Sequence, residues 1–141
     1  MSVDIKITVR PLPLFEKSGK GRIPYEQIAR KVLGKKYELS LVICGDALAR
    51  TMNRKYRKKS YKPNVLSFPL SKNEGEIFLN VHTAAREARR YKVALRDRLA
   101  FLFVHGCFHL KGLQHGRIME RQEQRTLRGF GFSCNGNYTR E

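Results

Sequence analysis

Residues 103–116 have the sequence FVHGCFHLKGLQHG and place three of the chain's four histidines within eleven residues. Residues four apart share one face of a helix, so His105 and His109 would project together with their imidazoles one turn apart. Gly112 can adopt the positive φ of a helix C-terminal turn, which would bring the chain round and return His115 to the same place. Three neutral imidazoles around Zn²⁺ leave a fourth position for water, as in catalytic zinc sites. The stretch therefore predicts a metal site at the end of a helix.

The same spacing occurs in the zinc-binding run of metzincin proteases, where a Glu after the first histidine is the general base. Gly106 occupies that position here, so the carboxylate that peptide hydrolysis requires is missing. A protease is therefore disfavoured. The alternative without a metal is that His105 and His109 are ordinary core or surface histidines of an apolar helix. Three histidines at this spacing with a glycine at the bend favour metal binding.

The charge of the chain indicates a polyanionic partner. Its 141 residues suit one domain that needs no disulfides. Lys and Arg number 29 against 12 Asp and Glu, a net charge of +17, while 41% of residues are hydrophobic. This combination is typical of a folded protein that binds RNA or DNA. An anionic membrane surface is less favoured, because no long basic amphipathic stretch stands apart from the predicted fold.

Cysteine usage and the ends of the chain favour a cytoplasmic protein. The three cysteines, Cys44, Cys107 and Cys134, contain no CxxC pair, which favours a reducing compartment. No signal peptide is recognisable at the N-terminus, and no run approaches the roughly 18 apolar residues of a membrane helix. We expect a soluble, cytoplasmic protein with no membrane partner.

Hydrophobic periodicity predicts a helix over residues 93–111 that is apolar on nearly all sides and hence central and buried. It is flanked by a helix at 81–91, capped by Asn80, and by a last helix at 118–130 with Met119, Gln122 and Leu127 inward. Upstream, strands are expected at 3–9, 37–44, 64–69 and 76–80, and helices at 25–33 and 47–58.

Further details concern individual residues of these elements. Val3, Ile5, Ile7 and Val9 would share one face of the first strand, and Asp46 with Gly45 would cap the helix at 47–58. The inward positions expected on that helix are Leu48, Met52 and Tyr56, with Lys55 as a further candidate. The strands at 64–69 and 76–80 lie close enough to form an antiparallel hairpin, with Pro69 at a sheet edge. This order of elements predicts a mixed four-stranded sheet with about five helices packed on it, an α/β (α+β) fold. One domain would span residues 1–130, followed by a flexible tail at 131–141.

The segment from residue 54 to residue 62 is the best candidate for nucleic-acid contact. It carries six cations among nine residues, interleaved with Tyr56 and Tyr61. Cations neutralise phosphates and aromatic rings stack on bases. A solvated helix end whose cations complement the helix dipole would explain two or three of the charges, but not six. The predicted RNA-binding residues are Arg54, Lys55, Arg57, Lys58, Lys59 and Lys62.

Two stretches together resemble the YbeY family of zinc-dependent rRNA maturation endoribonucleases. The family run H-G-x-x-H-L-x-G-x-x-H is matched from His105 to His115, and N-x-x-Y-R followed by V-L-S-F-P is matched at Asn53, Tyr56 and Arg57 and at residues 65–69. Gly75-Glu76-Ile77 resembles the family's G-D-I strand start. The matches extend from about residue 40 to residue 127, in the right order.

The resemblance implies a single-domain α/β sandwich with the metal site on its central helix. It implies that His105, His109 and His115 bind one Zn²⁺ per chain, or another divalent metal, and that Arg57 is a functional residue of an RNA-binding cleft. It also implies a cytoplasmic role in rRNA maturation and ribosome quality control. The partners would be rRNA and ribosomal subunits, with ribosomal proteins or other ribosome-associated factors. Two positions depart from the family: Gln114 and Asn64 stand where it usually has Asp, which would lower metal affinity or rate if those carboxylates orient a ligand or water.

The resulting hypothesis is a single-strand-specific endoribonuclease with Arg57 and His105 as catalytic residues. The metal would lower the pKa of bound water toward ~7, and the hydroxide or an RNA 2′-hydroxyl would attack the phosphodiester. Arg57 would stabilise the developing phosphoryl charge. Glu76 and Glu120 are the nearest carboxylates by sequence, and neither is assigned as general base. The alternatives are a non-catalytic ribosome-associated RNA-binding protein with a structural metal and a metal-dependent hydrolase of another substrate.

Overall fold

Alternating apolar residues build a sheet with both faces covered. The computed structural model describes residues 2–9 and 23–133. Along the second strand, Leu41 and Ile43 pack into one hydrophobic cluster and Val42 into another, on opposite faces, as the twofold side-chain period of a strand requires. The strands are β1 (Ser2–Ile7), β2 (Glu38–Cys44), β3 (Val65–Ser71) and β4 (Glu74–Asn80).

The four strands form one mixed sheet in the order β1-β2-β4-β3. β2 runs parallel to both β1 and β4, whereas β3 and β4 are antiparallel and are joined through Lys72 and Asn73. The predicted hairpin is therefore confirmed. β3 is an edge strand, which explains why Pro69, with no N–H to donate, is tolerated in it.

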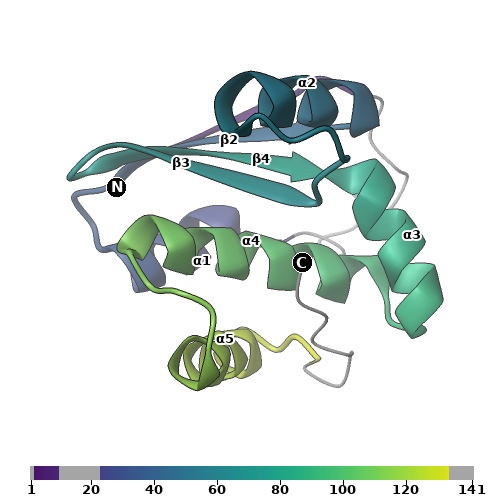
Figure 1. The fold of residues 1–141 in the computed structure, drawn as a ribbon. Coiled ribbons are helices and arrows are strands. Elements are labelled where there is room, and N and C mark those ends of the chain that lie inside the picture. Colours follow the sequence, from purple (N-terminus) through teal and green to yellow (C-terminus); the bar gives the residue numbers. More distant parts are fainter. Residues whose placement is uncertain (1, 10–22, 134–141) are drawn as a thin grey trace.

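Five helices surround this sheet in the described residues: α1 (Tyr25–Leu33), α2 (Asp46–Arg57), α3 (Val81–Tyr91), α4 (Leu95–Lys111) and α5 (Arg117–Gly129). Figure 1 shows α2 on one face of the sheet and α4 with α1 on the other. α5 lies against α4 on the side away from the sheet, and α3 lies at one end of the molecule. The predicted α+β class, with a mixed four-stranded sheet and five helices, is confirmed.

The histidine-bearing helix is the centre of the packing, as its sequence predicts. Leu99, Phe103 and Cys107 of α4 are buried in the same cluster as Leu41 and Ile77 of the sheet. α4 has packing partners on several sides, namely α1, α3, α5, β3 and β4. A helix enclosed in this way has little freedom to move, so it is a rigid platform for the side chains at its end.

Three expected inward positions are exposed: Lys55 and Tyr56 on α2 and Gln122 on α5. α2 packs on the sheet through Ala49, with Leu48 and Met52 partly buried beside it as predicted. Gln122 is exposed on α5, and its neighbour Glu123 takes the buried position between Met119 and Leu127.

The predicted first strand is present as β1, and its residues Ile5 and Ile7 are 45% and 50% exposed because β1 is an edge strand that α1 covers only in part. One prediction about α2 needs correction. Gly45, not Asp46, is the residue before the first turn of α2. Asp46 instead accepts hydrogen bonds from Asn80, Thr83 and Arg86, which connect α2 to the start of α3. By contrast, the bounds of α3 and its capping by Asn80 are as predicted.

The division into a domain at 1–130 and a flexible tail at 131–141 stays a prediction. Phe132 is buried at 3% exposure and lies under the guanidinium of Arg96, while residues 134–141, including Cys134, lie outside the described part of the chain. Within residues 2–9 and 23–133, no helix combines the length and apolarity needed to traverse a bilayer.

Candidate metal centre

The end of α4 and the loop after it bring three histidines together. His105 and His109 lie one turn apart, with their Nε2 atoms 3.0 Å from each other. The ring centroid of His115 lies 4.9 Å from that of His105 and 4.7 Å from that of His109. One ring nitrogen from each histidine can be chosen so that the three atoms all lie within 4.8 Å of one another. The three side chains thus converge as the spacing of the sequence predicts.

Glycine geometry on both sides of His115 makes this convergence possible. Gly112 ends α4 with φ of 103°, and its N–H donates to the His109 carbonyl over 3.0 Å. Gly116 precedes α5 with φ of 154°. L-residues rarely adopt such values, so the two glycines allow a loop short enough to return His115 to its partners.

The residues present fit a metal ion. Burial, reinforced by the neighbouring His105 and His115, lowers the pKa of His109 to about 4. His109 is therefore neutral near pH 7 and has a lone pair to donate, and only the neutral imidazole is a metal ligand. Nitrogen donors from three imidazoles suit zinc and neighbouring transition metals better than magnesium or calcium, which prefer oxygen.

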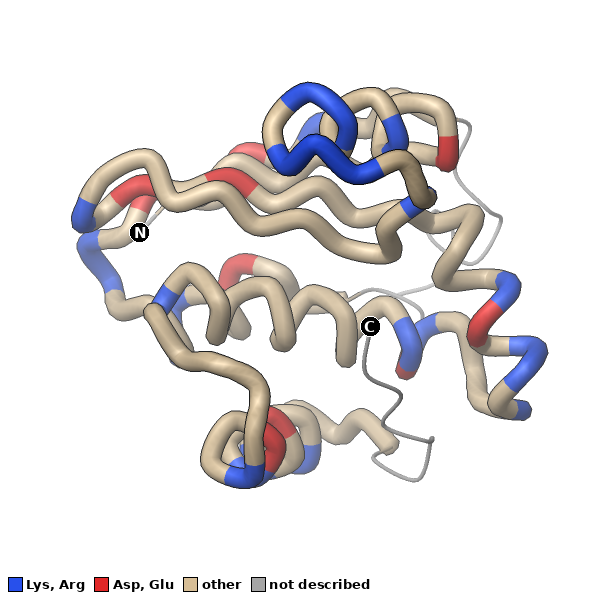
Figure 2. The backbone as a smooth tube through the Cα atoms, in the orientation of Figure 1, with Lys and Arg blue, Asp and Glu red and all other residues tan. Residues whose placement is uncertain are grey.

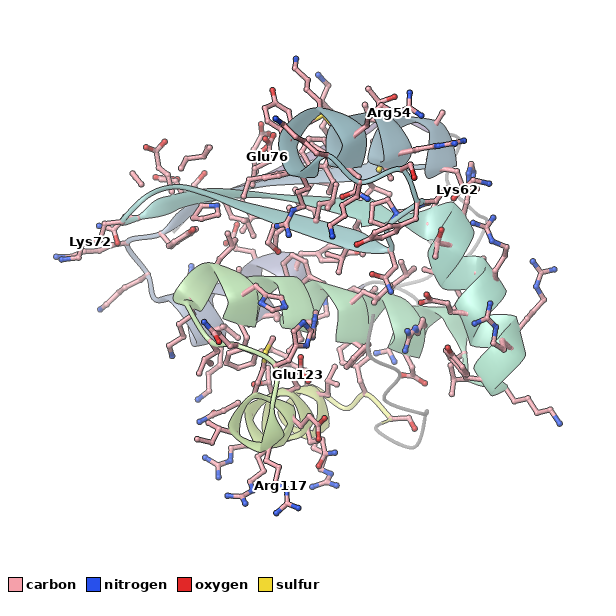
Figure 3. The ribbon with its side chains drawn as sticks, in the orientation of Figure 1. Arg54, Lys62, Lys72, Glu76, Arg117 and Glu123 are labelled. Carbon is pink, nitrogen blue, oxygen red and sulfur yellow. The ribbon has the colours of Figure 1, made fainter. Side chains whose placement is uncertain are left out.

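A buried carboxylate supports the first histidine. Glu123 of α5 is 2% exposed, and its Oε2 lies 2.5 Å from Nδ1 of His105. Figure 3 shows Glu123 on the side of α5 that faces α4. Sequence reasoning missed this residue by placing Gln122 inward. The available signal was the spacing Met119-x3-Glu123-x3-Leu127, which puts an acid in an apolar stripe.

Arg57 lines the same cavity as the three histidines. The cavity, of about 470 Å³, is lined by residues of three segments: Arg57 and Tyr61, residues 64–67 with Pro69, and the three histidines. Arg57 is the last residue of α2, and its Nη2 donates to the Ser67 carbonyl over 2.9 Å. Its guanidinium carbon lies 5.5 Å from the centre of the Phe68 ring. These contacts hold one cation at the cavity wall.

The other predicted RNA-binding residues lie outside the cavity. Arg54, Lys55, Lys58, Lys59 and Lys62 are exposed on the end of α2 and the segment that follows it. Figure 2 shows this concentration of Lys and Arg on the α2 side of the sheet, and Figure 3 places Arg54 and Lys62 there. Lys58 has φ of 57° and closes α2, and the chain that follows stays beside this helix, because the carbonyls of Ser60 and Tyr61 accept hydrogen bonds from Arg50 and Asn53.

The two tyrosines of the basic segment, Tyr56 and Tyr61, have different surroundings. Tyr61 lines the cavity and is 54% exposed, and its carbonyl accepts a hydrogen bond of 3.1 Å from the buried Asn53 amide. Tyr56 packs edge-on against Phe68. Tyr61, not Tyr56, therefore presents an aromatic ring next to Arg57 and the histidines.

The remaining candidate residues lie elsewhere. Glu76 accepts a hydrogen bond from Ser40 of β2, and neither Glu76 nor Glu120 is among the residues that line the cavity. His82, the fourth histidine, accepts a hydrogen bond from the Asp46 backbone on the surface, as expected for a residue outside the site.

The two residues that depart from the YbeY pattern, Gln114 and Asn64, differ in their exposure to solvent. Gln114 is exposed in the loop before His115. Asn64 is buried, and its Nδ2 donates to Glu87 at 3.1 Å, while Arg98 pairs with the same carboxylate at 2.8 Å. The amide at residue 64 therefore serves a buried network that a carboxylate there would oppose.

The fold and site define a small α+β domain in which three histidines that could hold a metal ion share a cavity with an arginine. A sequence model described as "Endoribonuclease YbeY" matches residues 20–131. The chain belongs to the YbeY family.

Curated relatives agree with this assignment. Endoribonuclease YbeY of Geobacter metallireducens is 38% identical over 97 residues, which cover 62% of this chain and 65% of the relative. The protein of the same name from Gluconobacter oxydans is 40% identical over 100 residues, which cover 66% of this chain and 60% of that relative. The chain thus matches somewhat less than two-thirds of the length of these relatives. The solution structure of TM1509 from Thermotoga maritima superposes with a TM-score of 0.62 at 17% identity, over 89% of this chain and 86% of the other, and shows the same fold.

Proposed function

We propose that this protein is a metal-dependent endoribonuclease that matures ribosomal RNA and takes part in ribosome quality control. The observation that carries the proposal is one cavity whose lining includes both the His105, His109 and His115 cluster and Arg57. Relatives named Endoribonuclease YbeY support it. Phosphodiester cleavage needs both an activated nucleophile and a cation for the phosphoryl oxygens, and these residues suit the two tasks.

The three histidines would hold one Zn²⁺ per chain. Bound zinc supplies Lewis-acid chemistry, polarising a phosphoryl oxygen and making water more acidic. The chain's own contribution is to present neutral imidazole nitrogens at fixed positions. Burial keeps His109 unprotonated, and α4 keeps His105 and His109 in register.

Arg57 would bind the scissile phosphate. One of its terminal nitrogens donates to the Ser67 carbonyl, and this bond fixes the plane of the guanidinium. A guanidinium carries five N–H donors in a planar fork, so donors remain for phosphoryl oxygens after this bond is made. A cation that is already held in place does not have to reorganise when charge develops on the phosphate. Such preorganised groups stabilise a transition state strongly.

The basic segment would guide single-stranded RNA into the cavity. Its exposed cations, Arg54, Lys55, Lys58, Lys59 and Lys62, would contact phosphates along the strand. The exposed ring of Tyr61 at the cavity wall would stack on an unpaired base. Because bases in a duplex are already stacked on each other, this contact favours single strands. rRNA within ribosomal subunits, in the cytoplasm, is the proposed substrate.

The test is cleavage of a labelled single-stranded RNA by zinc-loaded protein. We expect cleavage by the wild type and a loss of about a hundredfold or more in rate for His109→Ala and for Arg57→Ala. Lys72→Ala is the matched control, because Lys72 is an exposed cation at the far end of the β3–β4 hairpin and should leave the rate unchanged. Undiminished cleavage by His109→Ala would contradict a metal mechanism.

The same experiment separates the enzyme from an RNA-binding protein. A non-catalytic RNA-binding protein would bind rRNA but show no cleavage with or without zinc, and its His105→Ala variant would still support ribosome maturation. The proposed enzyme predicts that His105→Ala binds RNA and fails in maturation.

A further inference from the structure

Glu123 is an acid in an apolar position. It lies in the middle of α5, four residues from Met119 and four from Leu127, both of which are fully buried. A buried carboxylate costs several kcal/mol unless it is paired, so a leucine would stabilise this contact between α5 and α4 more simply. The position of Glu123 therefore calls for a specific partner.

That partner is the first histidine of the cluster. Oε2 of Glu123 lies 2.5 Å from Nδ1 of His105, a short distance typical of a charge-assisted hydrogen bond. An imidazole has two nitrogens on opposite sides of its ring. With Nδ1 occupied by Glu123, Nε2 is the nitrogen that faces His109, at 3.0 Å from Nε2 of that residue. The contact thus determines both the orientation of the His105 ring and the nitrogen that is free to bind a metal.

One other feature connects α5 with the same cluster. His115 lies in the short loop that joins α4 to α5, directly before Gly116. The contact between Glu123 and His105 joins the same two helices further along α5. Docking of α5 on α4 therefore sets the positions of two of the three histidines at once.

We propose that Glu123 is a positioning residue that holds His105 with its Nδ1 protonated and its Nε2 directed to the metal. This inference rests on the proposed metal site of the function above. It extends that site to α5, so that the cluster consists of three histidines and one buried carboxylate that contacts no metal itself.

The test is zinc affinity, measured by competition with a chromophoric chelator, for the wild type, Glu123→Leu and Glu123→Gln. We expect affinity to fall by about 10- to 100-fold for Glu123→Leu. Glu123→Gln keeps the size of the side chain and an acceptor oxygen but loses the charge, so we expect a loss of about fivefold to tenfold, since the bond is no longer charge-assisted. Glu26→Gln, which removes an exposed acid on α1, is the control and should match the wild type.

A second measurement separates positioning from mere packing. The ring-nitrogen NMR spectrum of metal-free protein should show His105 protonated at Nδ1 in the wild type and a mixture of tautomers in the variants. A purely structural role predicts a lower melting temperature with unchanged zinc affinity and an unchanged tautomer. Zinc affinity within twofold of the wild type for Glu123→Gln, or for a folded Glu123→Leu, would overturn the proposal. Neither measurement uses RNA, so absence of ribonuclease activity would contradict the proposed function without affecting this result.

Discussion

Asn64 is the residue at which this chain departs from the YbeY pattern inside the protein. Its amide donates to Glu87, whose carboxylate also pairs with Arg98, and all three side chains are buried. An Asp at this position would bring a second carboxylate against the first, with one guanidinium to compensate both. Asn64 is thus part of a buried network in which the charges of Glu87 and Arg98 already balance each other.

Restoring the family's Asp should therefore destabilise the protein. We expect Asn64→Asp to lower the free energy of unfolding by about 1–3 kcal/mol at pH 7, because a buried donor is exchanged for a charge without a partner. Urea denaturation measures this change. Asn73→Asp, at the exposed hairpin turn, is the control and should change little. Equal stability of the wild type and Asn64→Asp would show that the network accepts a second carboxylate.

His109 makes the stability of the metal-free protein depend on pH. Its pKa falls from an ordinary value of 6.5 to about 4 in the folded state, first because of burial. Above pH 6.5 the imidazole is neutral in both states. Between pH 6.5 and 4 the unfolded chain binds a proton that the folded chain does not, so stability decreases as the pH falls through this window.

The measurement is urea denaturation in the presence of a chelator at several pH values from 7 to 4. Stability of the wild type should decrease more steeply than that of His109→Ala over this range. Parallel pH profiles for the two proteins would contradict the neutral state assigned to His109.

At the scale of elements, the packing of α4 on the sheet explains the missing protease carboxylate. A Cβ at Gly106 would lie 3.0 Å from Ser67 Oγ and 3.2 Å from side-chain carbons of Ile77 and Val65. Ser67 also donates a hydrogen bond of 3.0 Å to the Gly106 carbonyl. The position after the first histidine therefore faces β3 and β4, and a side chain there would require these neighbours to shift.

Enlarging this residue should loosen the contact between α4 and the sheet. We expect Gly106→Val to lower the free energy of unfolding by about 1–3 kcal/mol, because β-branched neighbours cannot move aside easily. Gly129→Val places the same side chain at the end of α5, where nothing lies within 4 Å, and should have little effect. Denaturant unfolding of both variants measures the difference, and equal effects would contradict the packing described here.

Local elements were predictable from the sequence, whereas contacts between them were not. The bounds of α3 and the Asn80 cap follow from local spacing, and the hairpin of β3 and β4 from the short connection between its strands. The strand order β1-β2-β4-β3 depends on pairing between distant segments, which no local pattern specifies. The burial of Glu123 could have been read from its spacing to Met119 and Leu127, whereas its partner, eighteen positions away, could not. The three histidines were found because they are close in sequence.

At the scale of the whole molecule, the net charge of +17 should govern RNA affinity. The logarithm of the binding constant should fall linearly with the logarithm of salt concentration, with a slope of about −0.7 for each phosphate contact in a single strand. Replacing Lys58, Lys59 and Lys62 together by Ala should remove up to three phosphate contacts. The slope should become shallower by about 0.7 for each contact that is lost.

The control for this experiment removes the same charge elsewhere. Lys31, Lys35 and Lys36 are exposed at the end of α1 and after it, outside the cavity lining. Their replacement by Ala should leave the slope nearly unchanged if RNA follows the basic segment after α2. A flat salt dependence of the wild type would remove phosphate contact from both RNA-binding interpretations.

The proposed enzyme and the positioning role of Glu123 both depend on a metal ion held by His105, His109 and His115. The decisive measurement is the zinc content of the protein after loading and desalting, determined by elemental analysis beside a His109→Ala variant. The expected result is close to one equivalent of zinc per wild-type chain and almost none in His109→Ala. Equal zinc in both proteins, or no zinc in the wild type, would contradict the metal centre and the enzyme built on it.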